Sequence, residues 1–189
     1  MKKLLALALV ALMAGAAFAQ PGIGVFFSAT DFVDANTNMD TAGAPFNAYV
    51  VIIDSPVSSI GAYEVGITIS DPAVFVLSVT GPNGWTNFGS NTNHLCGFTT
   101  PVPVTEGAAV MATMNMLQSV ATEATISMGP ATPASIPDVP AIADGADPDV
   151  LIACVLDSGD SAPVVATLNG VGIVAAEAHS LSSVKALFN

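Results

Sequence analysis

The stretch IGAYEVGITIS, residues 60–70, constrains the fold more than any other part of the sequence. Apolar side chains recur there at every second position, as Tyr63, Val65 and Ile67, with small or polar residues between them. A period of two is the pattern of a β-strand that buries one face and exposes the other. We therefore predict a half-buried strand over residues 60–70.

Segments of the same kind follow one another along the chain. Short apolar stretches bounded by Pro, Gly or Asp predict further strands at residues 46–53, 74–80, 124–128, 150–156 and 164–168. Residues 108–117 fit both a helical and an alternating pattern, so periodicity leaves their structure open. Many short strands without a strand–helix–strand rhythm predict a single antiparallel β-sandwich, an all-β fold.

Two stretches are predicted to be irregular. Residues 81–93, GPNGWTNFGSNTN, are rich in Asn and Gly and predict a long loop. Residues 132–149 hold four prolines and predict an ordered connection over a sheet edge. Because proline lacks the N–H that an interior strand must donate, we expect no interior strand there.

The first residues predict export. The chain begins MKK, continues with an apolar run over residues 4–17, and reaches Ala17-Phe18-Ala19, which is the order of a signal peptide. We expect a signal helix at 1–19 that is cleaved after Ala19, a β-sandwich domain at 20–176 and a C-terminal tail at 177–189. No later apolar run is long enough to span a bilayer, so we expect a secreted protein, extracellular or periplasmic, without membrane insertion.

The tail has apolar residues at helical spacing, namely Leu181, Val184 and Phe188. Docking on the sandwich as a short amphipathic helix is the favoured interpretation. An added edge strand and a recognition tag are the alternatives.

The charge limits the partners. Loss of residues 1–19 leaves one lysine and no arginine against 15 carboxylates, which is a net charge of −14. Such a surface repels phosphate backbones and anionic membranes, so nucleic acid is not expected as a partner. An exported protein or a polysaccharide remains.

Two cysteines, Cys96 and Cys154, are expected to form a disulfide in an oxidising compartment. The alternative is a zinc site made by both cysteines with His94 and His179. The paired CxxC spacing of structural zinc sites is absent, which favours the disulfide.

Three short motifs resemble the cohesin-like and carbohydrate-binding-module-like jelly-roll family of exported bacterial proteins. Residues 59–64 lead through Ser70-Asp71-Pro72 to residues 73–75, which is similar to the family's strand, Asp-Pro turn and strand. Residues 107–114, GAAVMATM, resemble a strand of the family, and ADG at 143–145 and LNG at 168–170 resemble its closing turns. The resemblance implies a strand at 108–117 and a module that binds dockerin proteins through an exposed sheet face, or that binds sugars or builds surface layers.

A sugar-binding module would need aromatic faces in solvent. Trp85 and Phe88 are the candidates, with Asn83 and Asn87 as hydrogen-bonding neighbours. The competing interpretation is that Trp85 folds back and closes one end of the sandwich.

A secreted hydrolase would need a base beside a nucleophile, and only His94 and His179 are available. Neither lies in a nucleophile motif, so we expect no enzyme activity. The main hypothesis is therefore a secreted, non-catalytic binding or structural module of the cohesin-like protein-interaction type, and a carbohydrate-binding module is the alternative.

The segment DANTNMD, residues 34–40, places oxygen-bearing side chains at every second position: Asp34, Asn36, Asn38 and Asp40. An EF-hand loop would need Gly at its sixth position and an acid at its twelfth, where this chain has Met39 and Pro45. Asx side chains that cap turns explain the spacing without an ion. A calcium site completed by Asp31 or by a carboxylate of Asp144, Asp147 or Asp149 is the alternative, and no other cofactor is expected.

Overall fold

The computed structural model describes residues 20–32, 34–37, 42–82, 84–157 and 163–170. These residues form strands and connections and contain no helix. The strands are β1 (Gly22–Phe26), β2 (Asn36–Thr37), β3 (Pro45–Ile53), β4 (Ser59–Ile69), β5 (Val74–Thr80), β6 (Trp85–Asn87), β7 (Asn93–Pro103), β8 (Ala109–Gln118), β9 (Ala124–Gly129), β10 (Ala141–Asp144), β11 (Leu151–Ala153), β12 (Val155–Leu156) and β13 (Val164–Leu168). The predicted signal peptide at 1–19 and the tail at 177–189 lie outside the described residues.

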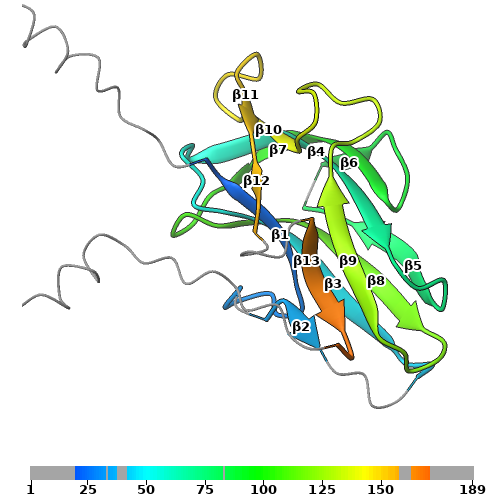
Figure 1. The fold of residues 1–189 in the computed structure, drawn as a ribbon. Helices are drawn as coiled ribbons and strands as arrows, with labels where there is room; N and C mark the ends of the chain where they lie inside the picture. Colours follow the sequence, from blue (N-terminus) through cyan, green and yellow to red (C-terminus); the bar gives the residue numbers. More distant parts are fainter. Residues whose placement is uncertain (1–19, 33, 38–41, 83, 158–162, 171–189) are drawn as a thin grey trace, which may run out of the picture.

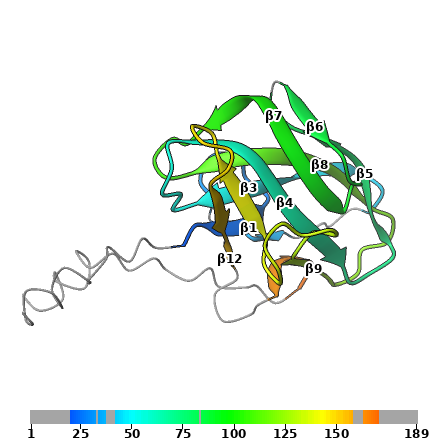
Figure 2. The same cartoon turned by 90° about the horizontal axis from the view of Figure 1, so that it is seen from above.

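Two sheets pack face to face (Figures 1 and 2). The five-stranded sheet has the order β12-β1-β3-β8-β5, and the eight-stranded sheet has the order β11-β10-β4-β9-β13-β2, with β7 joined to β4 and β6 joined to β7. The predicted β-sandwich is thus confirmed. Both sheets are mixed rather than purely antiparallel, because β12 runs parallel to β1 and β2 runs parallel to β13.

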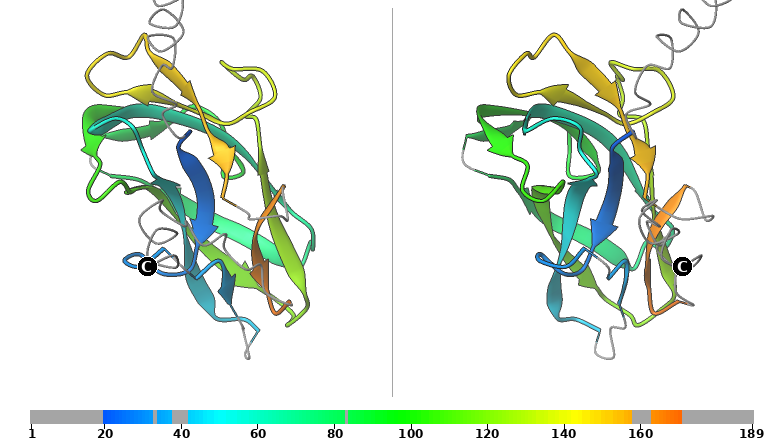
Figure 3. Two further views of the ribbon diagram at one scale, coloured as in Figure 1. Left: turned by 60° about the vertical axis from the view of Figure 1, so that its left-hand side comes forward. Right: turned by 90° about the vertical axis from the view of Figure 1, so that its left-hand side faces the viewer.

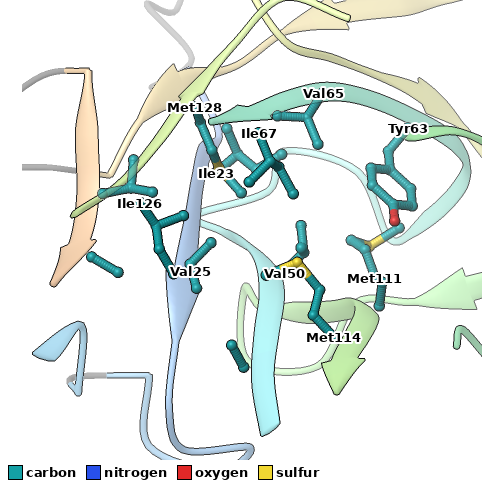
Figure 4. Close-up of a cluster of buried hydrophobic side chains, with 14 of the residues drawn as sticks. Ile23, Val25, Val50, Tyr63, Val65, Ile67, Met111, Met114, Ile126 and Met128 are labelled. Carbon is teal, nitrogen blue, oxygen red and sulfur yellow. The ribbon is translucent and has the colours of Figure 1, made fainter. Parts of the chain in front are cut away.

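The core lies between the sheets and follows the alternation in the sequence. Tyr63, Val65 and Ile67 on β4 point inward, as predicted, and meet side chains of the opposite sheet such as Val50 and Met114 (Figure 4). Burial of this kind contributes about 25 cal/mol per Å² of apolar surface.

The segment 108–117, which periodicity left open, lies in strand β8 from Ala109 onward. This strand pairs with β3 on one side and β5 on the other. Its fully buried methionines, Met114 and Met116, alternate with the half-buried Asn115 and Leu117. Long-range pairing therefore decided between two patterns that the local sequence allowed equally.

Two predictions of irregular structure are wrong in part. Strand β10 lies inside the proline-rich stretch 132–149 and is an interior strand, between β11 and β4. The prolines at 140 and 148 flank β10 instead of interrupting it, so its N–H groups remain available. The loop at 81–93 likewise contains the short strand β6, which pairs with β7.

The predicted disulfide between Cys96 and Cys154 is wrong, because both are free, buried thiols. Cys96 lies on β7, directly opposite Tyr63 of β4. Cys154 lies between β11 and β12, beyond both β4 and β10. Three strand spacings of roughly 4.8 Å separate β7 from β11, whereas the Cα atoms of a disulfide lie within about 7 Å of each other.

Candidate functional site

A shallow groove crosses the outer face of the eight-stranded sheet over β7, β4 and β10. Its volume is about 330 Å³. Gly97, Ala62 and Ala143 lie side by side across the three strands and form its floor. These side chains are too short to fill the outer surface, which explains why a groove forms here.

Gly97 is an open point of the floor. A Cβ atom placed on it would have nothing within 4 Å, so no neighbouring atom requires a glycine there. The groove is therefore open to solvent above β7, and a larger side chain at position 97 would project into it.

Two exposed apolar side chains form opposite walls. Phe88, in the turn after β6, is 77% exposed, and Leu151 at the start of β11 is 46% exposed. Figure 3 shows the β10–β11 hairpin, in yellow, at one end of the sandwich. The groove thus has exposed apolar side chains on both walls and small side chains on its floor.

Asn87 holds the turn that presents Phe88. Its Oδ1 accepts hydrogen bonds from the N–H groups of Gly89 (2.9 Å) and Leu95 (3.1 Å), and its Nδ2 donates to the Ser90 carbonyl (2.9 Å). Asn87 therefore shapes the loop, and its predicted role as a sugar-binding group stays a prediction. Asn83, its predicted companion, lies outside the described residues.

Residues 130–140, which we call the strap, join β9 to β10 over the same outer face. Glu64 of β4 is only 9% exposed because the strap covers it. Its carboxylate accepts hydrogen bonds from the Ser135 N–H (2.6 Å), the Ser135 hydroxyl (2.8 Å) and the Ile136 N–H (3.4 Å). Glu64 therefore anchors the strap at the edge of the groove.

Asn93 of β7 provides a second anchor. Its Nδ2 donates to the Thr132 carbonyl (2.8 Å), and its Oδ1 accepts from the Thr132 N–H (2.8 Å). The amide side chain thus pairs with the strap as a neighbouring backbone would. Two anchors from adjacent strands hold the strap at successive points.

A buried polar pair lies beneath the groove, on the inner face of the sheet. His94 is 0% exposed, and its Nδ1 lies 2.9 Å from the Tyr63 hydroxyl. Its Nε2 lies 3.2 Å from the Asn91 carbonyl, which only accepts, so Nε2–H donates and Nδ1 accepts from Tyr63. Burial lowers the pKa of His94 and raises the pKa of Tyr63 well above its usual value.

His94 is therefore engaged through both ring nitrogens and closed to solvent. The hydrolase hypothesis required His94 to lie in a cleft together with carboxylates. His94 is instead buried, so this requirement is not met. In the described ranges no three metal-ligating side chains come together, and His179 lies outside them.

Trp85 is half-buried and packs against the core, as the folding-back interpretation expected. Its indole Nε1 is buried, with no hydrogen-bond acceptor among the described residues. A Cβ atom on Gly81 would lie 2.3 Å from the indole ring, so only a glycine lets the chain approach the ring this closely. Of the two candidate rings, Phe88 is therefore largely exposed and Trp85 is packed against the core, and sugar binding by them stays a prediction.

The acidic segment at 34–40 is described in part. Asp34 is exposed, and the Asn36 Oδ1 accepts a hydrogen bond from the Thr167 hydroxyl (2.5 Å). Asn38 and Asp40 lie outside the described residues. Calcium binding at Asp34 stays a prediction.

The prediction that Asp144, Asp147 or Asp149 could complete that calcium site is wrong. These residues lie on or just after β10, at the opposite edge of the sheet from β2. Strands β4, β9 and β13 separate the two edges.

No charged side chain in the described part of the chain is basic, since the three lysines are residues 2, 3 and 185. In the same ranges no helix is long and apolar enough to cross a membrane.

Comparison with known proteins bears on the fold. No protein-family model matches the chain, and no curated protein matches it. Among solved structures, the sixth cohesin of scaffoldin B from Acetivibrio cellulolyticus, in complex with a Cel5 dockerin mutant, is similar over 80% of this chain and 99% of that one, with a TM-score of 0.50 and 12% identity. A non-cellulosomal cohesin from the archaeon Archaeoglobus fulgidus is similar over 73% of this chain and 86% of that one, with a TM-score of 0.46 and 8% identity. The chain therefore has a cohesin-like β-sandwich fold.

Proposed function

We propose that this protein is an exported, non-catalytic interaction module that binds a partner protein through the groove on β7, β4 and β10. The observation that carries the proposal is the apolar groove itself, whose floor is lined by small side chains and whose walls are the exposed Phe88 and Leu151. Apolar surface at the centre of an interface, with polar groups around it, is the usual arrangement of protein-binding sites.

The cohesin-like fold supports the same proposal, because the first of the similar structures is a cohesin in complex with a dockerin. The burial of His94 supports a module without hydrolytic chemistry. The inward packing of Trp85 leaves the polysaccharide alternative with only one largely exposed ring of its two candidates, Phe88.

Filling the groove tests the proposal. Gly97→Leu places a side chain above the floor, and Gly129→Leu is the matched control, since a Cβ atom there also has nothing within 4 Å and Gly129 lies on β9, outside the groove. Both variants are expected to keep the wild-type melting temperature within a few degrees.

Each form is immobilised and exposed to culture fluid of the producing organism, and bound proteins are identified by mass spectrometry. A protein retained by the wild type and by Gly129→Leu, and lost with Gly97→Leu, is the expected result. Equal retention by Gly97→Leu, or no retained protein at all, would contradict the proposal. A mature protein that begins at Gln20 in the same fluid would establish export.

A further inference from the structure

The two walls of the groove differ in charge. The wall at Phe88 continues into residues 89–92, which carry no ionisable side chain. The wall at Leu151 continues into the β10–β11 turn, where Asp147 and Asp149 are exposed next to the exposed Val150. One side of the groove is therefore apolar and neutral, and the other is apolar and acidic.

Nothing in the described part of the chain neutralises this acidic wall. The Asp147 carboxylate accepts only the N–H of Asp149 (3.3 Å), and no lysine or arginine lies within the described residues. An apolar surface beside unpaired carboxylates concentrates the negative potential at that edge, because its low dielectric screens the charges less than water does. A partner that brings its own carboxylates there would be repelled.

We propose that the groove accepts a protein segment with an apolar ridge and with lysine or arginine on the side that faces the β10–β11 turn. This inference rests on the proposed function and adds the chemistry and the orientation of the partner. The apolar ridge covers Ala62, Gly97 and Ala143, and the basic side chains meet Asp147 and Asp149.

The dimensions of the groove suit a helical segment. Phe88 adjoins β7 through a hydrogen bond from its N–H to the Leu95 carbonyl (3.0 Å), and Leu151 lies on β11. Four strand spacings, or roughly 19 Å, separate the lines of β6 and β11. An α-helix with its side chains is about 10–12 Å wide and fits between the walls.

Synthetic amphipathic helical peptides of 18 residues provide the probe. Four fluorescently labelled peptides contain the same number of leucines. In three of them a leucine face is flanked by lysine, by glutamine or by glutamate. The fourth has the composition of the lysine peptide with its leucines shuffled, so that it has no leucine face. Binding is followed by fluorescence anisotropy at 50 mM and at 500 mM NaCl.

Charge is tested with two pairs of substitutions that change the net charge equally. Asp147→Asn with Asp149→Asn removes the acidic wall, and Asp31→Asn with Glu123→Gln removes two exposed carboxylates from connections outside the groove. At 50 mM NaCl the first pair is expected to weaken binding of the lysine peptide about three- to tenfold, and the second less than about twofold. At 500 mM NaCl the difference is expected to disappear, because salt screens the exposed charges.

Apolar contact is tested with Leu151→Ser against Leu77→Ser. Leu77, on the edge strand β5 of the other sheet, is 49% exposed, close to the 46% of Leu151. Only Leu151→Ser is expected to weaken binding of the lysine peptide.

Four outcomes would overturn the inference: tight binding of the glutamine peptide, tight binding of the shuffled peptide, equal effects of the two charge pairs, or no binding by any peptide. If the glutamine peptide binds as tightly and still depends on Leu151, the proposed protein-binding function stands and only the basic chemistry of the partner is wrong.

Discussion

His94 and Tyr63 place a titratable pair in the core directly beneath the groove. The neutral imidazole accepts the Tyr63 hydroxyl and donates to the Asn91 carbonyl, so a second ring proton would remove the acceptor that Tyr63 uses. Burial lowers the pKa of His94. Protonation of this one residue therefore opposes the folded state.

The first prediction concerns the pH dependence of stability. Because the folded pKa of His94 lies below its unfolded value of about 6.5, the unfolded chain binds more protons in acid. The contribution of His94 to the free energy of unfolding is therefore fully present above pH 6.5. It falls as the pH drops from 6.5 through the folded pKa, by at most about 1.4 kcal/mol per pH unit. Urea unfolding from pH 7.5 to 5 should show this decline, and His94→Gln should remove most of it. An unchanged slope in His94→Gln would show that another group is responsible.

The second prediction concerns the thiols. Burial raises the pKa of Cys96 and raises the pKa of Cys154 to about 12, so both remain protonated and unreactive at neutral pH. Iodoacetamide should label neither in the folded protein and both in guanidinium chloride without a reductant. Protection that persists in guanidinium chloride and disappears with a reductant would mean that a disulfide does form.

The third prediction concerns calcium at Asp34. If calcium binds there, it stabilises the folded state by mass action, and millimolar calcium should raise the melting temperature above that in NaCl of equal ionic strength. Asp34→Ala should abolish the increase, and Asp144→Ala, at the other edge of the sheet, should leave it unchanged. Identical melting curves with calcium and NaCl would exclude the site.

At the scale of elements, the strap lies over the sheet and depends on two side chains. Glu64 accepts three hydrogen bonds from Ser135 and Ile136, and Asn93 pairs with both backbone groups of Thr132. Elsewhere in the strap only Ala131 and Pro140, near its ends, are buried. These anchors thus determine its position beside the groove.

The fourth prediction follows from the anchors. Glu64→Ala removes the acceptor of the Ser135 and Ile136 N–H groups, and the loss of such an acceptor costs about 1–3 kcal/mol. Hydrogen exchange measured by mass spectrometry should be about tenfold faster or more in the strap, and exchange in β3 and β8 should be unchanged. Thr68→Ala, an exposed position on the same strand, is the control. Equal exchange in Glu64→Ala and the wild type would mean that Glu64 does not anchor the strap.

At the scale of the whole molecule, no lysine or arginine lies among the described residues to pair with their carboxylates. Asp71 shows how such a group is accommodated: the Thr122 hydroxyl and the Ala73 N–H donate to it and lower its pKa. At Asp71, hydrogen bonds therefore take the place of an ion pair. The repulsion among the remaining carboxylates is not offset within the described chain.

The fifth prediction concerns salt. Raising NaCl from 20 to 300 mM screens this repulsion and should raise the melting temperature by a few degrees. Asp31→Lys with Glu123→Lys, which lowers the net negative charge, should show a smaller increase. A melting temperature that falls or stays constant would contradict net repulsion in the folded state.

The local sequence pattern predicted where strands lie and which face of each points inward. It predicted less well which strands pair with each other. Val65 and Ile67 could be assigned to the core because a period of two leaves a strand only one apolar face. Strand β7 was not predicted. Strand β10 was not predicted either, because the prolines around it indicated an irregular connection. In the site, Phe88 was predicted, and Glu64, Gly97 and Leu151 were not assigned to it.

The sequence by itself determined the class of the fold and the sign of the charge, because alternation and composition are local properties that do not depend on pairing. Only the tertiary structure decided which residues form the groove. Ala62, Gly97, Ala143 and Leu151 are far apart in the chain and become neighbours through the register of β4 with β7 and of β10 with β4 and β11. The same pairing placed two strands between the cysteines, since strand order is set by long-range hydrogen bonds and packing that no local segment encodes.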